Sequence, residues 1–166
     1  MANATQNIAR QLDMEIARAE KRLMVPGSSL KGSMKNALAR FFEDKLIVIA
    51  VIRQGVSYSL FNSIKEATPF TEENWAEFLD LSTKSLHRYK QTSKTFRPLQ
   101  SEKIIEMAEV THVGLDVFGD MEKFKLWLET PNFSLGNLKP IELLKDSYGK
   151  ELVVSELTRI NYGILV

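Results

Sequence analysis

A short basic segment carries the residues with the clearest potential for chemistry. Residues 81–100 contain five Lys or Arg residues and no Asp or Glu, whereas residues 46–80 and 101–166 each carry a net negative charge. Contact with a polyanion such as a nucleic acid requires a basic island of this kind. A solvated basic helix face explains the charge equally well, so charge alone leaves both interpretations open.

The residue order around this island is typical of a helix-turn-helix, in which the second of two helices enters the major groove of DNA. Thr71 can cap the first helix, because its hydroxyl can accept a backbone N–H and acidic residues follow it. Leu81-Ser82 supplies a short turn, and we predict the second helix over residues 83–91.

In the second helix, only Leu86 and Tyr89 need to face the core. Small hydroxyl residues near a helix start, followed by Arg and Lys, can bond phosphates and base edges. The alternative is that this basic helix packs on the acidic helix before it or contacts a protein partner. The predicted DNA-binding residues are Ser82, Thr83, Lys84, Ser85, His87, Arg88, Lys90 and Lys94.

Enzymatic and metal-binding chemistry find no support in the sequence. There is no Cys and there are only two His residues, which excludes thiolate chemistry and His-rich metal sites. The carboxylates form no convergent pair, and Gly27, Gly32 and Gly55 lack the spacing of a phosphate-binding loop. We therefore expect no enzyme activity, no metal site and no cofactor.

Composition and hydropathy are those of an ordinary globular protein. The 166 residues are 44% hydrophobic and 26% charged, and can form one compact domain or two small ones. The longest apolar run, residues 46–52, is far shorter than the ~20 residues of a membrane helix. Mixed charges near the N-terminus argue against a secretory signal, and the lack of Cys suits a reducing compartment. We expect a cytoplasmic protein without a membrane partner.

Hydrophobic periodicity predicts an all-α fold. Apolar residues at helical spacing predict an amphipathic helix over residues 5–24, followed by a flexible linker over 25–36. The β-branched run at 46–53 would also suit a strand, but no partner strand exists, so we predict a buried helix that ends at Gly55. Another helix is expected over residues 57–67.

The C-terminal third continues this pattern. Helices are predicted over residues 101–115 and, after a cap at Asp120, over 121–129, with Phe124 and Trp127 packed in the core. Pro140 opens a short helix at its favoured first position. Gly149 is expected to separate that short helix from a last one over residues 152–160.

The order of short motifs in this third is more specific than any one of them. They are Val117-Phe118-Gly119-Asp120, Trp127-Leu128, Thr130-Pro131-Asn132, Leu135-Gly136, Lys139-Pro140-Ile141, Leu143-Leu144, Tyr148-Gly149 and Tyr162-Gly163. In this order they resemble the toxin-binding domain of the Xre/MbcA/ParS antitoxin superfamily. With the helix-turn-helix-like segment in front, the whole resembles the Xre antitoxin of RES–Xre toxin–antitoxin pairs. The usual Leu-Gly-Gly turn here has Asn137 as its third residue, and asparagine tolerates the left-handed backbone conformation.

This resemblance implies partners and a mechanism. The partners are a cognate RES-domain toxin, from a family of enzymes that deplete cellular NAD, and operator DNA for autorepression. A homodimer formed through the helix-turn-helix would suit a palindromic operator. In related antitoxins the C-terminal region blocks the toxin's active-site cleft. By position, the expected toxin-binding residues are Arg159, Asn161, Tyr162, Gly163, Ile164, Leu165 and Val166. The alternative is that this apolar tail packs on its own domain.

We expect three parts along the chain: an amphipathic arm and linker (1–36), a helix-turn-helix-like domain for DNA binding and dimerisation (37–100) and a toxin-binding domain with its tail (101–166). Residues 1–35 match nothing in the family; disorder, an oligomer interface and DNA binding are all open for them. The basic residues available for DNA there are Arg10, Arg18, Lys21, Arg22, Lys31 and Lys35. The alternative functions are a stand-alone helix-turn-helix transcriptional regulator without a toxin partner, and an adaptor for an unrelated protein.

Overall fold

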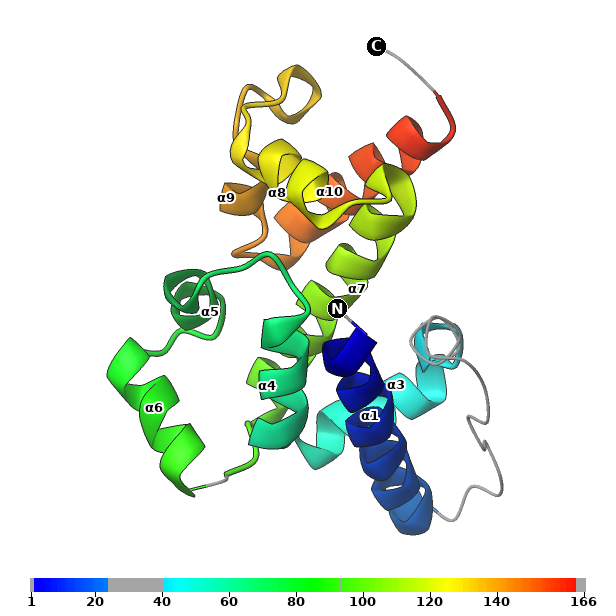
Figure 1. Cartoon of the computed structure of the whole chain (residues 1–166), viewed down its shortest axis with the longest axis vertical. Coiled ribbons are helices and arrows are strands. Elements are labelled where there is room, and N and C mark those ends of the chain that lie inside the picture. The colour runs from blue at the N-terminus through cyan, green and yellow to red at the C-terminus, as the bar shows by residue number, and fades with distance from the viewer. Residues whose placement is uncertain (1, 24–40, 93, 164–166) are drawn as a thin grey trace. The chain divides into compact units, whose positions relative to one another are not determined.

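The computed structural model describes residues 2–23, 41–92 and 94–163, and helices joined by turns and loops make up this part of the chain (Figure 1). The elements are α1 (Ala2–Leu23), α3 (Lys45–Gln54), α4 (Tyr58–Glu66), α5 (Glu72–Phe78), α6 (Thr83–Thr92), α7 (Pro98–Phe118), α8 (Met121–Glu129), the 3-10 helix η1 (Phe133–Leu135), α9 (Pro140–Leu143) and α10 (Ser147–Asn161). Within these ranges extended backbone pairs only in the isolated bridges Ser57–Thr95 and Asn132–Leu138. The all-α prediction is confirmed. None of the described helices is both long and apolar enough to cross a membrane.

The chain divides into two compact units. The first contains residues 1–67 and 83–105, and the second contains residues 68–82 and 106–166. The two helices of the predicted helix-turn-helix therefore belong to different units, with α5 in the second and α6 in the first. The three-part division expected along the sequence stays a prediction.

In the first unit, α1 packs against α3 and α4 (Figure 1). Its residues Ile8, Leu12 and Ile16 are buried, as the helical spacing predicts. Glu15 is only 2% exposed, and its carboxylate accepts a hydrogen bond from Gln54 Nε2 of α3 at 3.1 Å. The possibility that this segment is disordered is thus wrong for residues 2–23, while the predicted linker lies outside the described residues.

The helix expected at residues 46–53 is present as α3. Asp44 caps it by accepting the backbone N–H groups of Leu46 and Ile47, and Gly55 ends it with a φ of 91°. The expectation that this helix is buried is wrong for one side, because Leu46 is 73% exposed while Ile47 and Val51 are buried. Since α3 packs by one face only, its uniformly apolar sequence could not show which residues point inward.

The second unit confirms several caps and corrects two boundaries. Asp120 caps α8 by accepting Lys123 N at 3.0 Å, and Pro140 opens α9. Helix α7 continues through Phe118, so the predicted break there begins only at Gly119, whose φ is 66°. The prediction that Gly149 separates two helices is wrong, because α10 begins at Ser147 and contains it.

Gly149 lies inside a helix because α10 packs closely on the preceding helix, α9. Asp146 caps α10 by accepting Gly149 N at 2.8 Å. A Cβ on Gly149 would overlap the carbonyl oxygen of Leu143, at the end of α9. Glycine at this position therefore permits a close approach between two backbones, and it does not act as a helix stop.

Replacing Gly149 with alanine tests this packing. In an ordinary helix the change would stabilise by up to ~1 kcal/mol. Here we expect a loss of about 1–3 kcal/mol in the free energy of unfolding, because a backbone carbonyl cannot rotate away from the new methyl group. Urea unfolding measures it. The control Ser155→Ala, at an exposed position of the same helix, should stay within about 0.5 kcal/mol of wild type. A Gly149→Ala variant as stable as wild type would contradict the close approach.

Candidate functional sites

Two side chains hold α6 against the first unit. Leu86 is buried, and the Tyr89 ring stacks on Phe96 with centroids 4.6 Å apart and an interplanar angle of 8°. Phe96 is itself buried against Phe61 of α4, with their centroids 4.9 Å apart. The prediction that Leu86 and Tyr89 face the core is confirmed, and it leaves the remaining side of α6 outward.

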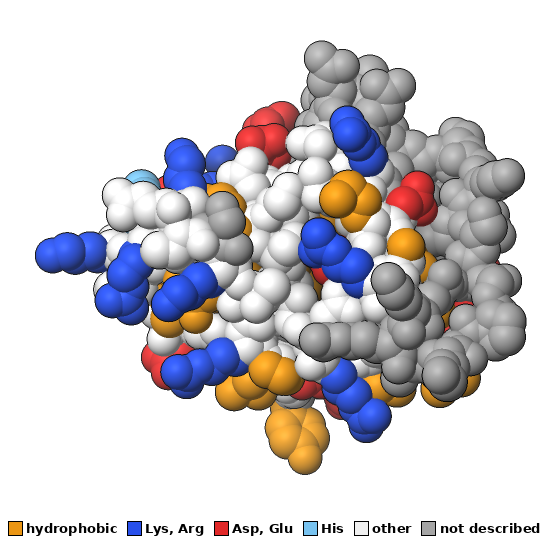
Figure 2. Space-filling model, turned by 90° about the horizontal axis from the view of Figure 1, so that it is seen from below, with side chains coloured by type: hydrophobic (Ala, Val, Ile, Leu, Met, Phe, Trp, Pro, Cys, Tyr) orange, Lys and Arg blue, Asp and Glu red, His pale blue; other side chains and the backbone are white. Residues whose placement is uncertain are grey.

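Most of the residues predicted to bind DNA are exposed. Ser82, Thr83, Lys84, His87, Arg88, Lys90 and Lys94 are exposed, and Ser85 is half-buried. Figure 2 shows Lys and Arg side chains projecting separately from the surface. The arrangement presents cations that can reach phosphates without disturbing the core. DNA binding by these residues stays a prediction.

The turn before α6 is closed by backbone bonds of the second unit. Leu81 N donates to Ala76 O at 2.9 Å and Asp80 N donates to Glu77 O at 3.2 Å, with Asp80 at a φ of 51°. This is the Schellman arrangement, which usually has glycine at the left-handed position. It ends α5 sharply and gives the short connection that a helix-turn-helix needs.

The start of α5 contains a residue that the sequence reasoning missed. The predicted cap is confirmed, since Thr71 Oγ1 accepts Asn74 N at 3.2 Å. Asn74 Oδ1 also accepts Thr71 N at 3.0 Å, which completes a reciprocal capping box. The Thr-x-x-Asn spacing is the signal that could have identified it, by analogy with the usual Glu or Gln partner.

The predicted toxin-binding residues gather at the end of α10. Asn161, Tyr162 and Gly163 are exposed, while Arg159 is half-buried and its Nη1 lies 3.4 Å from Glu156 Oε2. The last three, Ile164, Leu165 and Val166, lie outside the described residues. Tyr148 lies outside the last helix predicted from the sequence (152–160), but in the structure it is an 83% exposed residue of the first turn of α10.

The two aromatic residues of α8 pack as expected. Phe124 is fully buried, and the half-buried Trp127 stacks on it with centroids 6.3 Å apart. Phe118, the last residue of α7, lies 5.8 Å from Trp127 between ring centroids. The prediction of core packing is thus confirmed in full for Phe124 and in part for Trp127.

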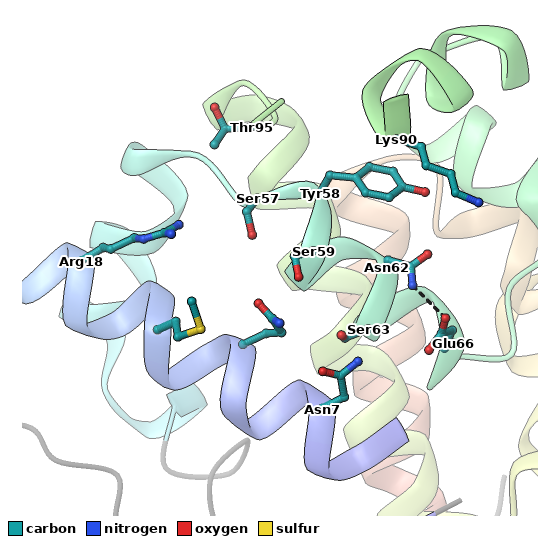
Figure 3. Close-up of a pocket in the computed structure, with 12 residues that line it drawn as sticks. Asn7, Arg18, Ser57, Tyr58, Ser59, Asn62, Ser63, Glu66, Lys90 and Thr95 are labelled. Atoms are coloured by element: carbon teal, nitrogen blue, oxygen red, sulfur yellow. Dashed lines mark hydrogen bonds between the residues drawn. The ribbon is translucent and has the colours of Figure 1, made fainter. Parts of the chain in front are cut away.

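A polar groove of about 640 Å³ lies in the first unit, mainly between α1 and α4 (Figure 3). Its wall is formed by Asn7, Gln11, Met14, Arg18, Ser57, Tyr58, Ser59, Asn62, Ser63, Glu66, Lys90 and Thr95. Asn62 Nδ2 donates to Glu66 Oε1 across one turn of α4 at 2.7 Å. In the described part of the chain, no cluster of His, Asp and Glu could hold a metal ion.

Comparison with known proteins finds two family matches, which follow one another along the chain. A family described as the antitoxin Xre-like helix-turn-helix domain matches residues 48–109. A second, described as the antitoxin Xre/MbcA/ParS C-terminal toxin-binding domain, matches residues 114–163. The chain is also 26% identical over 119 residues to antitoxin Xre of Yersinia enterocolitica serotype O:8 / biotype 1B, covering 71% of this chain and 80% of that protein.

Among solved structures, one chain of the crystal structure of the MbcT–MbcA toxin–antitoxin complex of M. tuberculosis has a similar fold. The TM-score is 0.54 at 23% sequence identity, and the match covers 66% of this chain and 96% of that chain. The two matched families follow one another in the order expected from the sequence and together include α4 to α10. This protein therefore belongs to the Xre/MbcA/ParS family of antitoxins.

Proposed function

We propose that this protein neutralises a cognate RES-domain toxin by binding it directly and occluding its active site. The observation that carries the proposal is the match of residues 114–163 to a domain described as toxin-binding. The similar solved chain comes from a toxin–antitoxin complex, which supports a protein partner of this class. The RES identity of the toxin rests on the resemblance of the whole chain to Xre antitoxins of RES–Xre pairs.

The end of α10 is suited to this role. Tyr162 is 75% exposed and ends the helix, and the chain then continues into three apolar residues. An exposed aromatic side chain such as Tyr162 is stabilised when a partner covers it. We propose that the residues from Arg159 to Val166 enter or border the toxin's active-site cleft.

Co-expression with the adjacent gene tests the proposal. The neighbour alone should arrest growth and deplete intracellular NAD, and this chain should restore both. Growth curves and an enzymatic NAD assay measure the two effects. A harmless neighbour, or a toxic one that this chain fails to neutralise, would instead favour a stand-alone helix-turn-helix regulator.

Truncation after Tyr162 separates the tail from the rest of the domain. The variant keeps all of α10 and the residue that caps its C-terminal end, Tyr162, so its thermal unfolding should match that of wild type. We expect it to lose rescue in the co-expression assay, because the toxin's active site stays open, while its DNA binding is unchanged. Full rescue by the truncated chain would show that the tail does not block the toxin.

We also propose that a homodimer binds operator DNA through α6 and represses its own operon. Lys84 and Arg88 lie one helical turn apart on the exposed side, with Lys90 and Lys94 following. Exposed cations of this kind contact phosphates, and the hydroxyls at the helix start can reach base edges. The match of residues 48–109 to an Xre-like helix-turn-helix domain supports this reading.

The triple variant Lys84→Ala, Arg88→Ala and Lys90→Ala tests the DNA site. It should bind operator DNA more weakly, and the slope of log K against log salt concentration should fall by up to about three, one for each lost phosphate contact. Titrations at several salt concentrations measure the slope.

The matched control removes the same charge from the second unit, by Lys123→Ala, Lys125→Ala and Lys139→Ala. It should leave the slope unchanged. Equal weakening in both variants would indicate a general charge effect, and unaltered binding by the α6 variant would move the DNA site elsewhere.

A further inference from the structure

We propose that the toxin docks along one face of α10, formed by Tyr148, Leu152, Ser155, Arg159 and Tyr162, which we call the α10 stripe. This inference rests on the proposed function and deepens it. The proposed function places inhibition of the toxin at residues 159–166. The α10 stripe, in contrast, supplies most of the surface that the toxin binds.

The spacing of these residues places them on one side of the helix. They follow one another at intervals of four, three, four and three residues. At 3.6 residues per turn, such positions fall within ~80° of one another around the helix axis. Val153 and Leu157 lie on another side and are fully buried, so the orientation of α10 is determined.

The α10 stripe exposes large side chains that a monomer has no reason to keep in solvent. Tyr148 is 83% exposed and Leu152 is 55% exposed, one turn apart, and Tyr162 is exposed at the far end. Single exposed apolar residues are ordinary, but Tyr148 and Leu152 adjoin on one face of the helix, and exposed apolar side chains that group together mark a binding surface. Tyr and Arg are also the residues most enriched in the energetic centre of interfaces.

The helix that carries the α10 stripe is held rigidly in its unit. Lys150 Nζ lies 2.7 Å from Glu109 Oε2 of α7, and both side chains are largely buried. Farther along the helix, Val153 and Leu157 are fully buried in the core of the unit. A surface that is ordered before binding loses little conformational entropy when a partner docks.

The dimensions and chemistry favour a protein partner. From Tyr148 to Tyr162 the α10 stripe extends ~21 Å, enough for the centre of an interface that buries about 800 Å² on each partner. One cation among aromatic, aliphatic and hydroxyl groups does not suit DNA, which requires several. The toxin is the occupant because the stripe lies within residues 114–163, which match the domain described as toxin-binding.

Full-length protein carrying Tyr148→Ser and Leu152→Ser tests this inference against the purified product of the adjacent toxin gene. We expect the dissociation constant, measured by titration calorimetry, to rise at least about 100-fold, because two large anchoring side chains are lost. Ser155→Trp, which adds bulk at the middle of the exposed stripe, should also weaken binding. The matched control is Leu126→Ser, which removes another exposed leucine of the same unit from α8, and it should bind as wild type does.

Circular dichroism, thermal unfolding and light scattering on each variant should match wild type, which assigns the lost affinity to the surface itself. Wild-type affinity in both stripe variants would overturn the inference while leaving the proposed function intact. A change in oligomeric state without a change in toxin affinity would also overturn it, by showing that the stripe joins two copies of this chain. If wild-type protein itself fails to bind the toxin, the proposed function fails instead.

Discussion

The close approach of α10 to the Leu143 carbonyl, which a glycine at position 149 permits, determines how the C-terminal unit presents its surface. Because α10 begins at Ser147 and packs at once on the end of α9, its phase is set from the first turn. Val153 and Leu157 then point into the core. The same rotation turns Tyr148 and Leu152 outward. This backbone contact thus helps to determine which side of α10 is buried and which side a partner can reach.

Helix α6 is also oriented by its buried side chains, although it has fewer of them. Leu86 and the Tyr89–Phe96 stack supply its buried contacts, and most of its other side chains are exposed. The helix before it is held differently. α5 packs by Trp75 and Phe78, whose rings meet edge to face with Phe70, all within the second unit. The segment matched by the helix-turn-helix family therefore contributes core residues to both units.

Local signals predicted most of the fold because they act through nearby atoms. The caps at Thr71 and Asp120 and the helix start at Pro140 depend on one side chain and the turn beside it, and all three are confirmed. Gly149 was misread because its role depends on a contact with another helix, which no local pattern contains. The error also shortened the last helix to residues 152–160 and so separated Tyr148 from Leu152. The candidate surface on α10 could not be recognised until both belonged to one helix.

The packing of the N-terminal helix limits how it could bind DNA or another subunit, although neither matched family includes this helix. α1 lies outside both matched families, yet Ile8, Leu12 and Ile16 are buried against the first unit. Full burial of such side chains stabilises by about 1.5–3 kcal/mol each, so α1 is part of the unit's core. Its inner face is thereby occupied, and the nearly buried Glu15 ties it to Gln54. A role in DNA binding or oligomerisation must therefore use the outer face, where Arg10 is exposed.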